Sequence, residues 1–283
     1  MKKWLFPVLL SFLLLVPGLC WAQKGGFVFM ASTIGPIDSG IVGALEDQFE
    51  KETGIRVRHV GAGTGAALKI AEQGNVDLVM AHAKALEEKF IAGGFGTERI
   101  PLMYNDFVIL GPASDPAAIR GMKTGAEALK AIAAKQSLFI TRGDKSGTHV
   151  AEMDIWARAG IKPDGTWYVT CEKGSLGNVP TTKFADEKGA YVFMDRATYL
   201  ALRKDIKLVI LVENDEALLN YISLIPVNPK KFPRVNYADA TAFAKWLTDP
   251  AKGQKLIADF GKDKYGAALF FPNSKQWRAV NGK

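Results

Sequence analysis

The residues with the clearest potential for chemistry lie in segment 141–149, Thr-Arg-Gly-Asp-Lys-Ser-Gly-Thr-His. An apolar run that predicts a buried strand precedes this segment, and a one-sided apolar pattern that predicts a helix follows it. Ser146, Gly147 and Thr148 therefore fall at a helix start, where free N–H groups and the helix dipole attract anions. Arg142 adds a planar fork of donors that suits a tetrahedral oxyanion or a carboxylate. The segment predicts a site for a small anion.

Two other interpretations of this segment remain open. Ser146 or Thr148 could simply cap the helix while Arg142 forms a surface ion pair, because such caps are common at helix starts. Ser146 and His149 could also suggest a serine hydrolase. No strained nucleophile turn and no orienting acid accompany them, so we expect the chain not to be an enzyme.

Two further loops follow predicted strands nearer the N-terminus. Residues 26–31 form an apolar run that predicts a buried strand, and 32–40 are expected to form the loop after it. Gly61-Ala-Gly-Thr-Gly65 lies between a predicted strand at 55–60 and a predicted helix at 66–73. Glycines in such a loop let a ligand approach the backbone, although the spacing is not that of a dinucleotide site. Parallel strands would bring these loops to one edge of a sheet.

Strand–helix units continue along the chain. Further helices are predicted at 41–53, 84–92, 124–135, 196–204, 239–247 and 252–261, and further strands at 76–81, 102–111, 191–194, 207–212 and 220–227. Residues 162–174 are expected to form a linker, and 174–182 a loop into a helix with Pro180 at its first position. The pattern predicts an α/β fold of two lobes, each a mostly parallel sheet flanked by helices, with the loops facing a cleft.

Composition sets broad limits on function. The 283 residues are 48% hydrophobic and 23% charged, which is typical of a soluble globular protein. The formal charge is +7, but Lys and Arg are scattered and no basic run is interleaved with aromatic residues. We therefore expect no nucleic-acid partner, whereas the basic balance would help to attract an anion.

The N-terminus predicts export. A basic start is followed by an apolar stretch at 4–16 and by small residues around Ala22, so residues 1–22 are predicted to be a cleaved signal peptide. The stretch is too short for a confident membrane span. An acylated Cys20 is the alternative, which the bulky Leu19 before it disfavours. We expect a periplasmic protein.

Cysteine and histidine patterns predict neither a disulfide nor a metal site. Cys171 would remain alone after removal of the signal peptide, so no internal pair is possible. His59, His82 and His149 are far apart in the sequence and lie in no metal-ligand spacing. We expect no cofactor.

Over nearly its whole length the chain resembles one family, the periplasmic tungstate-binding proteins of ABC-type importers. The matching segments are Phe49–Ile55, Val60–Gly65, Glu87–Phe90, Met103–Val108, Arg142–His149, Glu187–Tyr191, Asp195–Arg196 and Leu256–Lys262. The resemblance implies two α/β lobes joined by two hinge strands that close on a dehydrated oxyanion. It also implies a membrane permease as partner and no enzymatic activity.

The resemblance also implies which residues bind. Family members use hydroxyls after the first strand, the glycine-threonine-glycine loop, the arginine and the serine-glycine-threonine helix start. In this sequence we therefore expect the ligand-binding residues to be Ser32, Thr33, Thr64, Gly65, Arg142, Ser146, Gly147 and Thr148, together with Asn178 and Thr181 in the second lobe.

Two departures from the family pattern affect the expected ligand. Ile34 and Gly35 replace family hydroxyls in the first loop, and Asn178–Thr182 replaces a glycine-methionine-glycine-alanine-threonine pattern. Missing hydrogen bonds to a buried anion are costly, about 1–3 kcal/mol each. Tungstate or molybdate is the first expectation, and a small organic carboxylate held by Arg142 is the alternative.

The expected organisation is a monomer with lobe I at 23–110 and 223–283 and lobe II at 111–222, moving about strands near Leu110 and Ile222. Two other classes share this architecture. The effector domain of a transcription regulator is disfavoured by the export signal and the lack of a helix-turn-helix segment. A binding protein that serves a sensor rather than an importer is not distinguished by the sequence.

Overall fold

The computed structural model describes residues 26–282, so the predicted signal peptide (1–22) lies outside the described residues. The strands are β1 (Phe27–Ser32), β2 (Arg56–Gly61), β3 (Leu78–Ala81), β4 (Ile100–Gly111), β5 (Phe139–Thr141), β6 (Tyr168–Thr170), β7 (Tyr191–Asp195), β8 (Val209–Val212), β9 (Leu219–Pro226) and β10 (Phe271–Pro272). The helices are α1 (Ile34–Asp38), α2 (Ile41–Thr53), α3 (Thr64–Ala71), α4 (Lys84–Ala92), α5 (Gly125–Ala134), α6 (Gly147–Arg158), α7 (Asn178–Lys188), α8 (Arg196–Leu202), α9 (Tyr237–Thr248), α10 (Gly253–Asp259), α11 (Lys262–Tyr265) and α12 (Lys275–Asn281).

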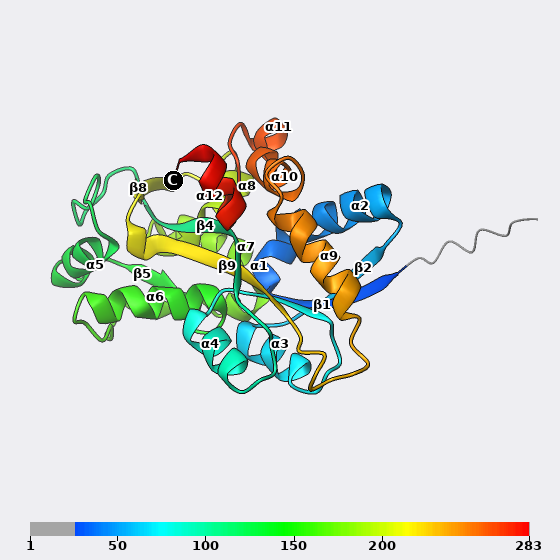
Figure 1. Cartoon of the computed structure of the whole chain (residues 1–283). Coiled ribbons are helices and arrows are strands. Elements are labelled where there is room, and N and C mark those ends of the chain that lie inside the picture. The colour runs from blue at the N-terminus through cyan, green and yellow to red at the C-terminus, as the bar shows by residue number, and fades with distance from the viewer. Residues whose placement is uncertain (1–25, 283) are drawn as a thin grey trace, which may run out of the picture.

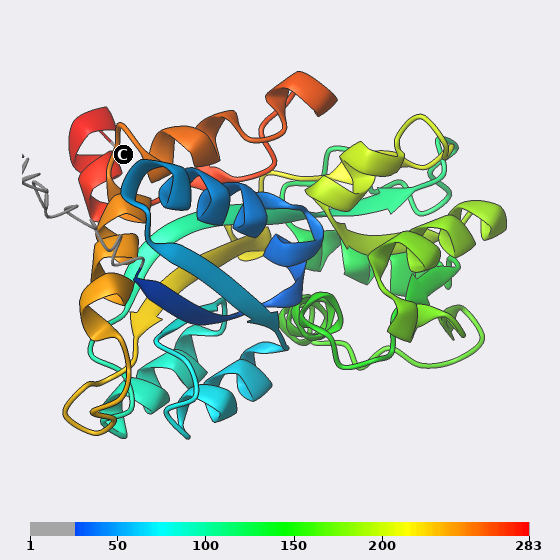
Figure 2. The same cartoon turned by 90° about the vertical axis from the view of Figure 1, so that its right-hand side faces the viewer.

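Hydrogen-bonded strands follow the order β2-β1-β3-β9-β4-β7-β5-β6, with β8 and β10 also paired to β4. The pairs β1–β2, β1–β3, β5–β6 and β5–β7 are parallel, as expected for strand–helix–strand units. β9 is antiparallel to β3 and β4, and β4 is antiparallel to β7. Helices flank the strands on both faces (Figures 1 and 2), so the predicted α/β class is confirmed.

The long strand β4 belongs to both halves of this arrangement. Its residues 100–106 pair with β9, while 107–110 pair with β7 and 109–111 with β8. In Figure 1, β1 and β2 lie at one end of the molecule and α5 and α6 at the other, with β4 and β9 running between them. The parallel groups β1–β3 and β5–β7 are therefore connected through these two strands.

Each half has its own apolar core. In the half that contains β1, helix α2 places Leu45 and Phe49 on one face, and the Phe49 ring lies 4.8 Å from that of Phe243 in α9. In the other half, Trp156 of α6 packs edge-on against Phe139 of β5 at 5.3 Å. Full burial of such a side chain contributes about 1.5–3 kcal/mol, so these contacts hold helices in place on the strands.

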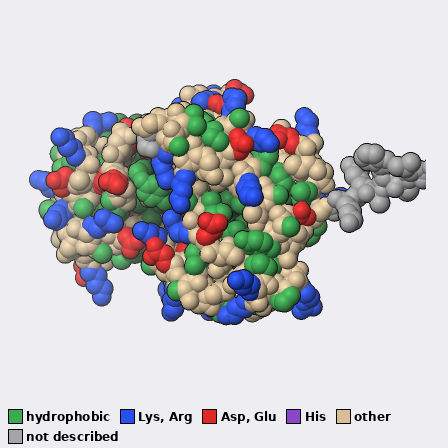
Figure 3. All heavy atoms as spheres, viewed as in Figure 1, with side chains coloured by type: hydrophobic (Ala, Val, Ile, Leu, Met, Phe, Trp, Pro, Cys, Tyr) green, Lys and Arg blue, Asp and Glu red, His purple; other side chains and the backbone are tan. Residues whose placement is uncertain are grey.

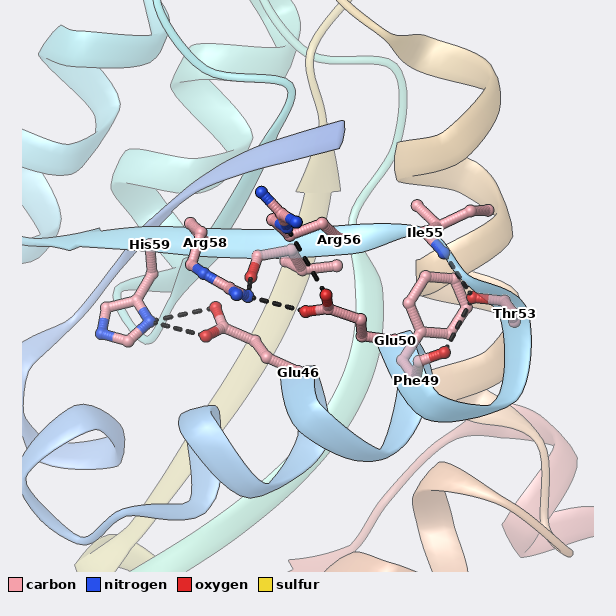
Figure 4. Close-up of polar contacts among 9 residues, drawn as sticks. Glu46, Phe49, Glu50, Thr53, Ile55, Arg56, Arg58 and His59 are labelled. Atoms are coloured by element: carbon pink, nitrogen blue, oxygen red, sulfur yellow. Dashed lines mark hydrogen bonds and ion pairs between the residues drawn. The ribbon is translucent and has the colours of Figure 1, made fainter. Parts of the chain in front are cut away.

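Charged groups occupy the outer surface. Basic and acidic side chains are interspersed on the face shown in Figure 3. On the edge strand β2, Arg58 pairs with Glu50 of α2 at 3.0 Å, and His59 Nδ1 lies 3.0 Å from both carboxylate oxygens of Glu46 (Figure 4). Charged side chains on an edge strand discourage pairing with another chain. Among the described residues, no helix is both long and apolar enough to cross a membrane.

Several predicted boundaries were wrong. The expected loop at 32–40 contains the short helix α1, and the expected linker at 162–174 contains β6. Helix α7 begins at Asn178 with Gly177 as N-cap, so Pro180 occupies its third position rather than its first. The segments α1 and β6, like the unpredicted β10, α11 and α12, are too short to show clear periodicity.

Candidate functional site

The first part of the candidate site forms where β1, β2 and β3 end. Ser32 is paired with Gly61 on one side and with Met80 on the other. Beyond the strands, the Thr33 N–H donates to Met80 O at 3.1 Å, and the Ala62 N–H donates to Ser32 O at 3.0 Å. The pairing thus brings Thr33 next to the glycine-rich loop, as the sequence predicted.

Two hydroxyls in this part have no partner inside the protein. Among the described residues, the Oγ1 atoms of Thr33 and Thr64 are the buried side-chain polar atoms without a hydrogen-bond partner. Thr33 itself is 1% exposed. A buried polar group without a partner costs about 1–3 kcal/mol, and such groups therefore call for a functional explanation.

Backbone donors surround the same two hydroxyls. Thr33 and Gly63 are the N-cap residues of α1 and α3, and neither cap has a side chain that accepts a first-turn N–H. First-turn N–H groups have no partner within their own helix. A Cβ placed on Gly35 or Gly65 would meet no atom within 4 Å, so the backbone is open at both helix starts.

The second part of the site is centred on Arg142, which follows β5. Its Nη2 donates to Asp144 at 2.6 Å, its Nε donates to Gly174 O at 3.2 Å, and its Nη1 donates to Asn178 Oδ1. Asn178 Nδ2 donates in turn to Asp195 at 2.6 Å. Three of the five N–H groups of Arg142 are thus fixed by protein acceptors, which orients the guanidinium and leaves two donors.

Asp144 organises the loop between Arg142 and α6. Its Oδ1 accepts from the Ser146 N–H at 3.1 Å, while its Oδ2 faces Arg142. Burial acts to raise the pKa of Asp144, but hydrogen bonds from Ser146 and the Arg142 charge outweigh it and hold that pKa below its usual value. The carboxylate therefore stays ionised and keeps the arginine in place.

The start of α6 is capped as the alternative interpretation expected. Ser146 Oγ accepts from the His149 N–H at 3.3 Å. Arg142 forms an ion pair with Asp144, but the pair is largely buried rather than on the surface as that interpretation expected. Capping uses an acceptor lone pair of Ser146. The N–H groups of Gly147 and Thr148 remain free of intrahelical partners. Capping and anion binding are thus compatible at this helix start.

Two expected ligands have other contacts. Thr181 is fully buried and its hydroxyl donates to Gly177 O at 3.0 Å, so its proton is already used. Asn178 uses its amide oxygen on Arg142 and its amide nitrogen on Asp195. In this structure Asn178 positions Arg142, and Thr181 stabilises the first turn of α7.

His82 joins the two parts of the site, and sequence reasoning did not select it. A Cβ built on Gly147 would lie 2.8 Å from His82 Cε1, so the imidazole at the end of β3 lies directly against the start of α6. Burial lowers the pKa of His82, opposed by Glu87 and by a hydrogen bond with Asn220, which favours the neutral ring. Its position after the carboxyl end of a strand was the available signal.

Asp38 at the end of α1 also connects the two parts. Burial raises the pKa of Asp38; the Arg142 charge lowers it and the Asp195 charge raises it. The α1 end therefore lies within electrostatic range of the arginine cluster. Sequence reasoning overlooked Asp38 because it expected this segment to be an irregular loop.

The side chain of Ile34 packs over Gly61 at the end of β2. Its Cδ1 is 3.0 Å from the place that a Cβ on Gly61 would occupy, and the side chain is 45% exposed. It thus covers the end of β2 and presents apolar surface next to Thr33. The backbone of Gly35, the next residue, is open, because a Cβ there would meet no atom within 4 Å.

Comparisons with known proteins agree over most of the chain. Residues 23–251 match the sequence model of the family described as PBP superfamily domain. The tungstate-binding protein TupA of Peptoclostridium acidaminophilum is 43% identical over 254 residues, which cover 89% of this chain and 87% of that protein. The solved structure of the tungstate-binding protein TupA from Desulfovibrio alaskensis G20 has a TM-score of 0.80 at 43% identity, covering 88% of this chain and 100% of that chain. The solved structure described as the tungstate ABC transporter from Geobacter sulfurreducens has a TM-score of 0.72 at 46% identity, covering 83% and 98%.

Proposed function

Because the chain belongs to the family of tungstate-binding proteins within the PBP superfamily, we propose that it captures tungstate, or its analogue molybdate, for an ABC-type importer. Its fold is the α/β fold of periplasmic binding proteins, and family membership confirms the expectation that it is not an enzyme. The observation that carries the proposal is the pair of buried hydroxyls, Thr33 Oγ1 and Thr64 Oγ1, without a partner inside the described part of the protein.

The proposed ligand set consists of hydrogen-bond donors from both parts of the site. Thr33 and Thr64 give hydroxyl protons, and the starts of α1, α3 and α6 give backbone N–H groups. Arg142 gives the N–H groups that Asp144, Gly174 and Asn178 leave free. A tetrahedral oxyanion accepts hydrogen bonds from all directions, so donors converging from several elements suit it better than a planar group.

We further propose that binding closes two lobes, 23–110 with 223–283 and 111–222, about β4 and β9. An anion that contacts donors of both lobes has a higher affinity for the closed form, and this difference drives the closure. We propose that the protein is exported to the periplasm with removal of residues 1–22 and that it is a monomer. Its closed form would then engage a membrane permease.

A small organic carboxylate remains a second candidate because of Ile34. This side chain is 45% exposed beside Thr33, where an apolar group of a ligand could contact it. Tungstate has no such group, so the exposed isoleucine is the one feature that favours a carboxylate.

Calorimetric titration with tungstate, molybdate, sulfate and a panel of small monocarboxylates tests the proposal. We expect tight binding of tungstate and molybdate and a large loss of affinity in Arg142→Ala. Lys145→Ala is the matched control, because this exposed side chain lies in the same loop. Binding of a monocarboxylate without binding of any oxyanion would replace the first proposal by the second.

A further inference from the structure

A hollow lies along the first half of β9, and of the residues placed in the candidate oxyanion site it shares His82. It has a volume of about 390 Å³, and we call it the β9 cavity; its lining residues are His82, Lys84, Arg99, Pro101, Leu219, Asn220, Tyr221, Ile222, Asn273 and Arg278. Ligand pockets in proteins typically measure roughly 300–1,000 Å³. The β9 cavity is therefore large enough for a small organic molecule.

Cationic groups dominate the polar lining. Lys84, Arg99 and Arg278 contribute three positive side chains, and none of the lining residues is acidic. The helices that carry Lys84 and Arg278, α4 and α12, lie on opposite sides of β9 (Figures 1 and 2). Basic side chains also gather near the middle of the face shown in Figure 3.

In the part of the chain that the structure describes, Arg278 is held in place by neutral groups. Its Nη1 donates to Asn273 O at 2.6 Å and to Asn273 Oδ1 at 2.7 Å. Within residues 26–282, no carboxylate oxygen lies within 4.0 Å of its guanidinium. A fixed guanidinium whose charge is not neutralised is prepared to bind an anion, and its fork geometry matches a carboxylate.

The opposite side of the cavity carries two basic side chains, Lys84 and Arg99, each with one acidic neighbour. Arg99 is paired at 2.6 Å with Glu87, which is fully buried, so this arginine is mostly neutralised. Lys84 has only Glu88 nearby, at 3.7 Å on the exposed surface, among the residues that the structure describes, and such a pair contributes little. Lys84 can therefore supply a second point of attraction.

The remaining lining is partly apolar. Pro101, Leu219 and Tyr221 present carbon surface, and Asn220 and Asn273 add amide groups. An inorganic oxyanion would leave this carbon surface without contacts. We propose that the β9 cavity binds a small organic di- or tricarboxylate, with one carboxylate on Arg278 and another near Lys84.

Titration with citrate and succinate tests this proposal, with acetate and inorganic phosphate as comparison ligands. We expect citrate to bind more tightly than acetate or phosphate, and Arg278→Ala to weaken citrate binding at least about tenfold. Arg278→Lys should restore only part of the affinity, because lysine lacks the fork. Lys275→Ala is the matched control, since it removes an exposed charge from the same helix outside the lining.

Variants at each site distinguish tungstate binding at the oxyanion site from citrate binding in the β9 cavity. Arg142→Ala should weaken tungstate binding and leave citrate binding intact, whereas Arg278→Ala should do the reverse. Thermal unfolding of each variant verifies that it is folded, and Arg278→Lys provides a second variant if the alanine variant unfolds. The proposal is overturned if wild-type protein binds neither citrate nor succinate at millimolar concentration, if phosphate binds as well as citrate, or if citrate binding persists in both Arg278 variants.

Discussion

At the scale of single residues, the most informative atoms are the two hydroxyl oxygens on Thr33 and Thr64. Most buried polar atoms in proteins have a partner, and these two lack one among the described residues. The hydroxyls therefore reduce the stability of the protein alone, and an oxyanion would provide the missing partner. Function and stability should respond in opposite directions when either hydroxyl is removed.

We predict that Thr33→Val and Thr64→Val each raise the free energy of unfolding of the protein without ligand, by about 1 kcal/mol. The same variants should bind tungstate at least about tenfold more weakly, because each loses a donor to a charged ligand. Urea unfolding and calorimetric titration measure the two effects.

Thr248→Val is the control for this prediction. Its hydroxyl is equally buried but donates to Ala244 O at 2.9 Å, far along the chain from the proposed site. This variant should lose stability and keep its tungstate affinity. If Thr33→Val and Thr64→Val lost stability in the same way, the two hydroxyls would be structural and the proposed ligand set would fail.

Glu152 makes a separate residue-scale prediction about pH. This buried carboxyl accepts from Thr141 Oγ1 at 2.8 Å, Tyr168 OH at 2.7 Å and Trp156 Nε1 at 3.1 Å. Burial raises its pKa to about 7, and the three hydrogen bonds only partly oppose this rise. The folded state thus holds the proton more tightly than the unfolded state, whose pKa is near 4.5.

Protonated Glu152 contributes to the free energy of unfolding. This contribution is fully present below pH 4.5 and is lost as the pH rises through 7. We predict that Glu152→Gln, which cannot ionise, is more stable than the wild type at pH 8 by on the order of 2 kcal/mol. The difference should shrink towards pH 5. Urea unfolding of both proteins at the two pH values tests this, and equal differences at pH 5 and pH 8 would show that Glu152 keeps an ordinary pKa.

At the scale of elements, the contact between the end of β3 and the start of α6 aligns the two parts of the site. His82 lies so close to Gly147 that a Cβ there would be 2.8 Å from His82 Cε1. We predict that Gly147→Ala displaces the start of α6 and lowers tungstate affinity about tenfold, a loss of about 1.4 kcal/mol. Calorimetry measures the change in affinity.

A compensating variant makes this prediction specific. His82→Ala removes the ring that the added methyl group would meet, so His82→Ala combined with Gly147→Ala should bind tungstate more tightly than Gly147→Ala alone. Without such a recovery, the loss in Gly147→Ala would have another cause than the contact with His82.

Elements with a strong amphipathic pattern were predictable from the sequence. α2 and α4 have the predicted bounds, because apolar side chains recur on one face and glycine ends each helix. α1 was not predictable, since five residues containing proline and glycine show no period. Its stability comes from contacts, such as that of Ile34 and Ile37 with Gly61, which only the folded chain provides.

The site was predictable to the extent that loops after parallel strands share an edge. That rule placed Thr33 beside the glycine-rich loop, and the sequence alone correctly placed Ser146 at a helix cap. The direction in which Asn178 points could not be predicted, because it depends on Arg142 and Asp195 from two other segments. His82 follows the end of β3 and could have been selected by the same rule, but its contact with Gly147 depends on another segment.

At the scale of the whole molecule, the two parallel groups of strands are joined through β4 and β9. A two-stranded connection bends and twists more easily than a wide sheet, so we expect the halves to move relative to each other. We predict that the radius of gyration from small-angle X-ray scattering falls when tungstate is added to the wild type and stays constant in Arg142→Ala. An unchanged radius in the wild type would argue against the proposed closure.

The placement of β9 in the sheet also dictates when the protein can fold during its synthesis. β3 lies between β1 and β9, and Leu78 pairs with Pro226. This pairing can form only after the much later residue Pro226 has been synthesised. Until β9 emerges from the ribosome, the edges of β3 and β4 stay unpaired and the N-terminal half cannot complete its sheet. Pairing over such a distance is slow. The half that contains β1 therefore completes its sheet only after most of the chain has been synthesised, whereas the core around Trp156 is built from the continuous segment 107–218 and does not depend on β9.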